Sequence, residues 1–257
     1  WGLVPSEPEG DSFLHQLSTN GPMARCPEDL ALLLSVQAGS DPRQPHEAGV
    51  FRMPDRLEPK PDLRIGWLGD WAGSFAMEEG VLSACEVGLR RFEEAGCIVE
   101  SLTAPFPPEQ LWESWVTLRS WTIAAGIEPL YADPKTKSAL KPEAIWEIET
   151  GKELSALAVH RASVLRSKWF KASAELFDTY DALVLPTAQC FPFSIDEDWP
   201  KQVNGVSMDT YHRWMEVMIP ASLIGLPAIA VPLPSQRPMG LQLMGRRGDD
   251  LKLLQLA

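Results

Sequence analysis

Short apolar runs alternate along the chain with longer stretches in which apolar residues recur at helical spacing. The clearest unit is an apolar strand at 63–68, a helix at 77–95 and a second strand at 97–102. Gly96 follows the helix, at a position where helices commonly end. Strand, helix and strand within about 40 residues form a βαβ unit, which requires parallel pairing and a right-handed crossover. We therefore expect a sheet that helices cover on both faces.

The rest of the pattern continues this alternation. A helix is predicted to begin at Pro27 and to stop at Gly39. Its apolar face comprises Leu30, Leu33, Leu34 and Val36. Further helices are expected near 108–126, 135–150, 152–178 and 208–224 and from 249, with strands at 181–185, 227–231 and 240–245. The helix at 152–178 has a predicted core stripe that includes Leu154, Leu157 and Trp169. Strands that alternate with helices place the chain in the α/β class.

One stretch is long and apolar enough to be considered as a membrane span. Residues 217–236 carry no charge over 20 positions. The prolines inside this stretch are Pro220, Pro227, Pro232 and Pro234. Each interior proline costs a helix about 3 kcal/mol and leaves a carbonyl unpaired. The stretch is therefore predicted to contain the end of a buried helix, a turn and a buried strand.

Composition and net charge indicate which classes of binding partner are not expected for this chain. Of the 257 residues 45% are apolar and 23% charged, values that are ordinary for a globular protein. The 23 Lys and Arg against 35 Asp and Glu give a net charge of −12. Nucleic acid and anionic membrane surfaces both need a basic partner, so neither is expected to bind this chain.

The cysteines carry no metal-ligand or disulfide pattern. The four of them are Cys26, Cys85, Cys97 and Cys190, with no CxxC and no histidine at ligand spacing. We expect reduced thiols in a cytoplasmic protein and no metal site. The first residues also lack the charged head and apolar run of a secretory signal.

Motifs for common chemistries are absent from the sequence. No GxGxxG follows a strand, and there is no GxxxxGK[ST] and no GxSxG, so nucleotide cofactors and an α/β-hydrolase nucleophile lack support. The four histidines, His15, His46, His160 and His212, are spread over four segments. Adjacent carboxylates such as Glu93 and Glu94 point in different directions on a helix. The residues alone predict an α/β domain with no catalytic constellation and no cofactor.

Several phrases, however, resemble the amidase signature family of amide hydrolases. Residues 1–6, WGLVPS, resemble the family's FGLRPS, and residues 20–34 resemble GPMARTVEDLALLL. YDALVLPT at 180–187 resembles YDALLTPT. GLPAIAVP at 225–232 and PMGLQLMG at 238–245 resemble GLPAISVP and PVGLQLVG. The phrases occur in the family's order and span essentially the whole chain.

The resemblance implies an amidase-signature-like fold, with a mixed, largely parallel sheet between helices. Family members use a Ser–cis-Ser–Lys triad, whose lysine and serines precede the phrase matched at residues 1–6. Residues 1–257 therefore resemble the carboxyl-terminal portion of one such domain, and we expect no catalytic residue in this chain. Lys60 and Ser74 lie in no matching motif, so neither receives a catalytic role.

The resemblance also implies a reaction and a place for this chain in it. A neutral lysine takes a proton, through the cis-serine, from the nucleophilic serine, which attacks an amide carbonyl, and water then releases the acid. This chain would supply part of the sheet and one wall of the substrate pocket. Thr187, just past the end of a predicted strand, is a candidate substrate-binding residue. Trp71 and Trp121 are candidate wall residues, although core packing would also explain both tryptophans.

Three hypotheses stay open at this point. The chain is the carboxyl-terminal part of an amidase whose amino-terminal half is its partner and whose substrate is a small amide, with a homodimer left open. It is alternatively a non-catalytic amidase-like domain that acts in binding or assembly. A third, unrelated interpretation is a hydrolase that uses Ser74 with His160 or His212.

Overall fold

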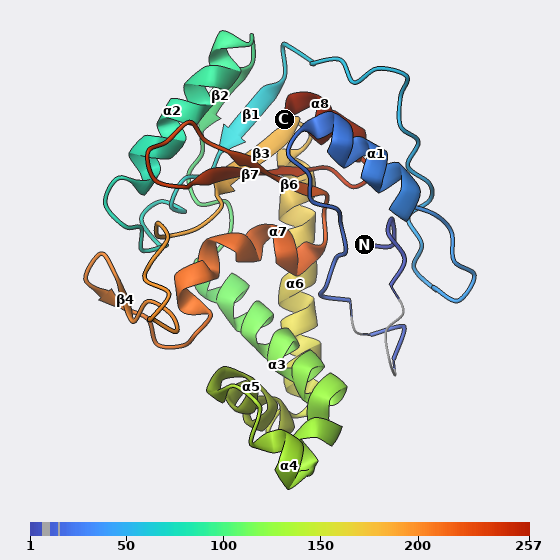
Figure 1. Ribbon diagram of the computed structural model, residues 1–257, viewed down its shortest axis with the longest axis vertical. Coiled ribbons are helices and arrows are strands. Elements are labelled where there is room, and N and C mark those ends of the chain that lie inside the picture. The colour runs from blue at the N-terminus through green and yellow to red at the C-terminus, as the bar shows by residue number, and fades with distance from the viewer. Residues whose placement is uncertain (7–10, 15) are drawn as a thin grey trace.

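A five-stranded mixed sheet forms the centre of the computed structural model, which describes residues 1–6, 11–14 and 16–257 (Figure 1). The strands, in their order across the sheet, are β2 (Ile98–Ser101), β1 (Arg64–Trp67), β3 (Ala182–Pro186), β7 (Gly240–Gly245) and β6 (Ala228–Pro232). β1 pairs in parallel with β2 and β3, whereas β7 is antiparallel to both β3 and β6. Four strands thus run in one direction and β7 opposes them, which confirms the α/β class and the largely parallel sheet.

The predicted βαβ unit is present as β1, helix α2 (Val81–Glu94) and β2. The helix begins four residues later than the predicted Met77. The reason is Gly80, which has a φ of 92° that a helix cannot contain, and the Glu78 amide, which donates to the Gln189 carbonyl 2.7 Å away. α2 packs on one sheet face through Gly88, which lies against Leu241 of β7.

The opposite face of the sheet is also covered, as expected. Leu183, Leu185 and Met244 point to that face and are fully buried. A long helix, α6 (Ala156–Leu176), passes behind the sheet and continues below it (Figure 1). α6 begins four residues later than predicted because Ser155 caps it, its hydroxyl accepting from the Ala158 amide. The predicted core stripe is correct at Trp169 and wrong at Leu157, which is exposed in the first turn.

Three further helices complete the helical layer below the sheet: α3 (Pro108–Ala132), α4 (Pro134–Lys137) and α5 (Pro142–Lys152). α3 packs against α6, and α4 and α5 pack against α3. α3 and α5 approach so closely that a Cβ on Gly151 would lie 2.2 Å from the Ser120 carbonyl oxygen. A glycine at this position is what permits the contact.

The predicted helix at 208–224 is two shorter elements. A 3-10 helix, η1 (Arg213–Met218), precedes α7 (Ile219–Ile224), and Met215 has a non-helical φ of −117°. Just before them lies a small hairpin, β4 (Gln202–Val203) and β5 (Val206–Ser207), which the pattern analysis did not predict. Its Asn204-Gly205 turn is a strong hairpin signal that was present in the sequence.

Within the charge-free stretch at 217–236, α7 ends at its C-cap Gly225 and β6 follows, as predicted. β6 is nevertheless not the buried strand that was expected, because it lies at the sheet edge and Ala228, Ala230 and Pro232 are exposed. Within the part of the chain that the structure describes, no helix combines the length and apolarity needed to cross a bilayer.

Helices α1 (Pro27–Gln37) and α8 (Asp250–Leu256) form a second, smaller core beside β6. Ala31, Leu34 and Leu254 are buried in it, whereas Val36 is 75% exposed. The predicted apolar face of α1 is therefore only partly correct. α1 also ends at Gln37, before Gly39, because Ala38 already adopts an extended conformation.

Candidate functional site

Two loops meet where the parallel strands β1 and β3 end. The fully buried Gln189 connects them, since its Nε2 donates to the Ala76 carbonyl at 2.9 Å and its Oε1 accepts from the Val217 amide at 3.1 Å. Glu78 adds a second connection, because its carboxylate accepts from the Phe191 amide at 2.9 Å and from Arg237 at 2.8 Å. The carboxyl ends of parallel strands are where open α/β sheets bind ligands, and here they are held by a network that motif analysis missed.

Thr187 lies at this end of β3, as predicted. Its side chain is half-buried, and its hydroxyl donates to the Gly240 carbonyl of β7 at 3.1 Å. Its amide donates to the same carbonyl at 3.0 Å. The hydroxyl oxygen keeps its acceptor lone pairs, so Thr187 can accept a hydrogen bond from a ligand while remaining fixed to the sheet.

The two candidate wall tryptophans are packed differently. Trp71 is fully buried in the turn after β1, where its ring lies 5.5 Å from that of Trp169 and its Nε1 donates to the Phe106 carbonyl at 2.8 Å. Trp121, on α3, is half-buried against the main core. The structure places Thr187 and Trp71 at the ends of neighbouring strands and Trp121 on the helical layer.

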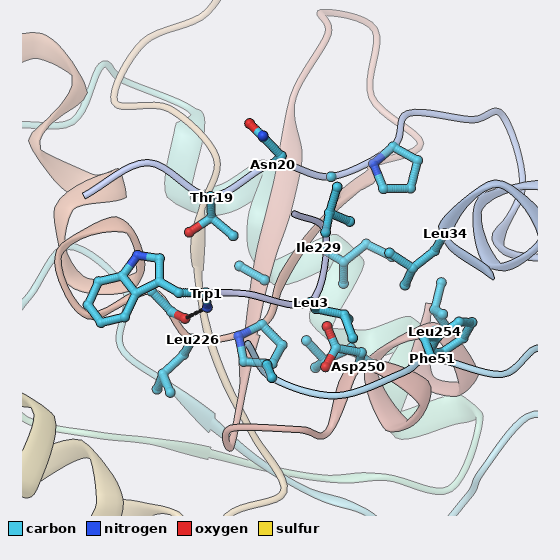
Figure 2. A pocket seen from close by; sticks show the side chains of 18 of the residues that line it. Trp1, Leu3, Thr19, Asn20, Leu34, Phe51, Leu226, Ile229, Asp250 and Leu254 are labelled. Atoms are coloured by element: carbon cyan, nitrogen blue, oxygen red, sulfur yellow. Dashed lines mark hydrogen bonds between the residues drawn. The ribbon is translucent and has the colours of Figure 1, made fainter. Parts of the chain in front are cut away.

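A large hollow lies elsewhere, around the free edge of β6, with a volume of about 850 Å3. Its walls come from the N-terminal segment, the loop at 19–24, α1, α8, β6 and β7 (Figure 2). Leu3, Ile229 and Leu254 make its interior largely apolar. Thr187, Trp71 and Trp121 are not among the described residues that line it.

Trp1 anchors the N-terminal segment to one wall of the hollow. Its backbone nitrogen donates to the Gly225 carbonyl at 2.9 Å (Figure 2). Gly225 has a φ of 58°, and its missing side chain leaves the space that the Trp1 ring fills, since a Cβ there would lie 2.1 Å from the ring. Any other residue at 225 would thus be strained and would displace the ring.

One charged side chain that lines the hollow has a shifted pKa. Burial raises the pKa of Asp250. The hollow therefore disfavours a negative charge at this position.

A buried charged cluster joins α3 and α5 to the segment before η1. Glu147 accepts from Arg119 Nε at 2.5 Å and lies 2.9 Å from Nε2 of His212, which is 1% exposed. Among the contacts of the described residues, none joins Ser74 to either histidine, and Ser74 and His160 are exposed. The geometry gives no support to Ser74 as a nucleophile, because a serine is activated by a base within hydrogen-bond reach and no contact of the described residues joins Ser74 to a histidine.

Comparison with known proteins identifies the family. The family model described as Amidase matches residues 1–254. One component of the glutamyl-tRNA(Gln) amidotransferase of Thermus thermophilus is 30% identical over 96% of this chain and 55% of its own length. The acylamidase of Rhodococcus erythropolis is 25% identical over 100% of this chain and 54% of its own length.

The fold agrees with this assignment. A bacterial aryl acylamidase of the amidase signature family superposes with a TM-score of 0.85 at 23% identity, over 99% of this chain and 55% of that protein. The chain thus spans about half the length of the relatives it matches. With the family model covering nearly every residue, and with the predicted phrases lying along β3, β6 and β7, this chain belongs to the amidase family.

Proposed function

We propose that residues 1–257 are the carboxyl-terminal portion of a single amidase domain. The complete domain hydrolyses a carboxamide, so that amide and water yield an acid and ammonia or an amine. The observation that carries this proposal is the family match along residues 1–254 in a chain that spans about half of its relatives. The nucleophilic serine then belongs to polypeptide outside this chain.

In this proposal the chain shapes the substrate pocket and supplies none of the reacting groups. Thr187 binds the substrate through its hydroxyl, with Trp71 and Trp121 forming the wall behind it. Support for Thr187 comes from its place at the end of β3 and from the acceptor capacity left by its bond to Gly240. Trp71 acts from within the core, because it is fully buried and packed against Trp169.

The chemistry follows the family's triad, held by the other half of the domain. A neutral lysine accepts a proton through the cis-serine from the nucleophile, which attacks the amide carbonyl. Backbone amides stabilise the oxyanion, the amine leaves with a proton, and water releases the acid. No side chain of this chain takes part in these proton transfers, so the chain alone is inactive.

The partner in this proposal is the amino-terminal half of the same fold. Neither nucleic acid nor a membrane surface is a partner, because the net charge is −12. We place the protein in the cytoplasm, where its four cysteines stay as the free thiols that the structure contains.

Complementation tests the proposal. We define the complementing segment as the part of the Rhodococcus acylamidase that this chain does not match. This chain and the complementing segment are produced separately and together, and release of para-nitroaniline from para-nitroacetanilide is followed, with the intact acylamidase as a positive control. Hydrolysis only by the mixture is the expected result. Hydrolysis by this chain alone, or a stable complex without hydrolysis, would contradict the proposal, and the latter result would favour a non-catalytic binding domain.

A further inference from the structure

The loop that follows Thr187 is not held by its own backbone. Within the part of the chain that the structure describes, the backbone groups of residues 188–193 are bonded only to Glu78. The Gln189 carbonyl accepts from the Glu78 amide at 2.7 Å, and the Phe191 amide donates to the Glu78 carboxylate at 2.9 Å. Beyond Thr187, the position of the loop therefore depends on bonds that reach across the fold.

The Gln189 side chain supplies two more of these bonds. It is fully buried, its Nε2 donates to the Ala76 carbonyl at 2.9 Å, and its Oε1 accepts from the Val217 amide at 3.1 Å. Packing alone does not require an amide here, because an apolar side chain of the same volume would fill the space. What glutamine adds is a pair of directed bonds to two distant segments, which indicates a role in setting the position of the loop.

Both partners of Gln189 belong to segments that are themselves well fixed. Ala76 follows Phe75, which is buried in the main core. Val217 is fully buried in η1, and the charged cluster of α3 and α5 holds His212 just before η1 begins. A hydrogen bond holds a loop only as firmly as its partner is held, so these two segments give Gln189 rigid anchors.

Resting on the proposed function, we propose that Gln189 is a positioning residue for the amide substrate. It ties the loop after β3 to Ala76 and Val217, and this fixes Thr187 where its hydroxyl can accept a hydrogen bond from the substrate's N–H. Gln189 acts from inside the fold, because its side chain is fully buried between these two partners. A substitution at Gln189 should therefore weaken substrate binding through Thr187 and leave the reacting groups of the triad in place.

The first part of the test measures the order of the loop in this chain alone, by hydrogen exchange resolved by NMR. Gln189→Met keeps the side-chain volume but removes both bonds, so the Phe191 amide should exchange at least about tenfold faster. Gln242→Met is the matched control, because Gln242 is also buried but its Nε2 has no partner among the described residues. It should change the Phe191 rate less than about twofold. Circular dichroism and unchanged exchange in β1 show that the fold is kept.

A second variant separates hydrogen bonding from packing, and it carries the test if Gln189→Met does not fold. Gln189→Glu keeps the shape and an acceptor for the Val217 amide, and burial favours the protonated carboxyl, which can donate to the Ala76 carbonyl. The Phe191 amide should then exchange within about threefold of the wild-type rate, and more slowly than in Gln189→Met. A residue that only filled space would give the reverse order, because methionine suits an apolar core better than a carboxyl.

The last part of the test asks whether Gln189 acts through Thr187. In mixtures with the complementing segment, Gln189→Met and Thr187→Val should each raise KM for para-nitroacetanilide about tenfold and change kcat less than about threefold. The double variant should add less than about threefold to the larger single effect, because a displaced hydroxyl and a missing one are the same loss.

Each outcome decides the inference. Unchanged exchange at Phe191, slower exchange in Gln189→Met than in Gln189→Glu, a loss confined to kcat, or effects that multiply in the double variant would each overturn the positioning role. No hydrolysis by any mixture, the wild-type one included, would instead overturn the proposed function. The exchange rates of this chain alone would then still decide whether Gln189 holds the loop.

Discussion

The protein packs more densely around one end of the sheet than around the other. On the side of β1, β3 and the helical layer, aromatic rings and a buried ion-pair cluster fill the interior, with Trp71 and Trp169 fully buried. On the side of β6, α1 and α8, a hollow of about 850 Å3 separates the elements, and Gln242 has an unpaired donor. Buried polar atoms without a partner occur in both regions, His212 Nδ1 among them, so the two regions differ in how densely they are packed.

This difference in packing bears on the proposal that other polypeptide completes the domain. Protein interiors are close-packed, so an open region beside a charge-free strand edge is where the proposal expects another segment to pack. Four sets of variants test the contrast between the two regions, and the set with the largest expected effect comes first.

The largest effect is expected from removing a ring on the closed side. Trp169→Ala deletes a fully buried ring and the bond from its Nε1 to the Pro220 carbonyl at 2.7 Å, so it should lower the free energy of unfolding by about 3–5 kcal/mol. Trp1→Ala, the matched change in the hollow, should cost less than about half as much. Urea denaturation of both variants measures this difference, and equal losses would abolish the contrast.

Two glycine substitutions test how closely α3 and α5 pack in the helical layer. Gly151→Ala should destabilise by about 1–3 kcal/mol, because its Cβ would lie 2.2 Å from the Ser120 carbonyl oxygen. Gly126→Ala in α3, where a Cβ meets nothing within 4 Å, should stabilise by about 0.5–1 kcal/mol. Thermal melts of the two variants should therefore shift in opposite directions. A shift in the same direction would show that the α3–α5 contact is looser than the structure indicates.

The unsatisfied amide of Gln242 gives a prediction for stability. Gln242→Met removes the unpaired donor at similar volume, so this chain should become more stable by about 1 kcal/mol, as urea denaturation would measure. A destabilised variant would mean that Gln242 already has a partner within this chain.

The smallest effect concerns the charge at the hollow. Burial raises the pKa of Asp250 above the ordinary 3.8, so the native state holds this proton more tightly than the unfolded chain. Stability from this group is present below the unfolded pKa and is lost as pH rises through the folded value. Relative to Asp250→Asn, the wild-type chain should thus lose stability, by less than about 1 kcal/mol, as pH rises through this window. Glu100→Gln controls for loss of one carboxylate, and a wild-type gain would reverse the sign.

Much of the fold could be predicted because local patterns and tertiary packing agree. The βαβ unit, the strand before Thr187 and the break at Gly225 all follow from apolar runs bounded by glycine and proline. The predictions of burial were wrong where an apolar pattern lies on a part of the chain that no other element covers. Leu157 has helical spacing but lies in an exposed first turn, and β6 is apolar without being covered.

The candidate site was less predictable, because its contacts are long-range. Thr187 was found from its place after a strand, whereas Gln189 connects segments 113 and 28 residues away along the chain, which no local pattern indicates. Gln242 did give a signal, since it is the one polar residue in the otherwise apolar strand GLQLMG. Its unpaired amide could be recognised only once the strand order was known.

The most direct test of the account is to find which polypeptide carries the nucleophile. A fluorophosphonate that labels activated serines is added to this chain, to the complementing segment and to their mixture, and labelled peptides are identified by mass spectrometry. We expect one labelled serine, in the complementing segment and only in the mixture, with no labelled serine in residues 1–257. A labelled serine in this chain alone, whose replacement by alanine abolishes amide hydrolysis, would contradict the central claim.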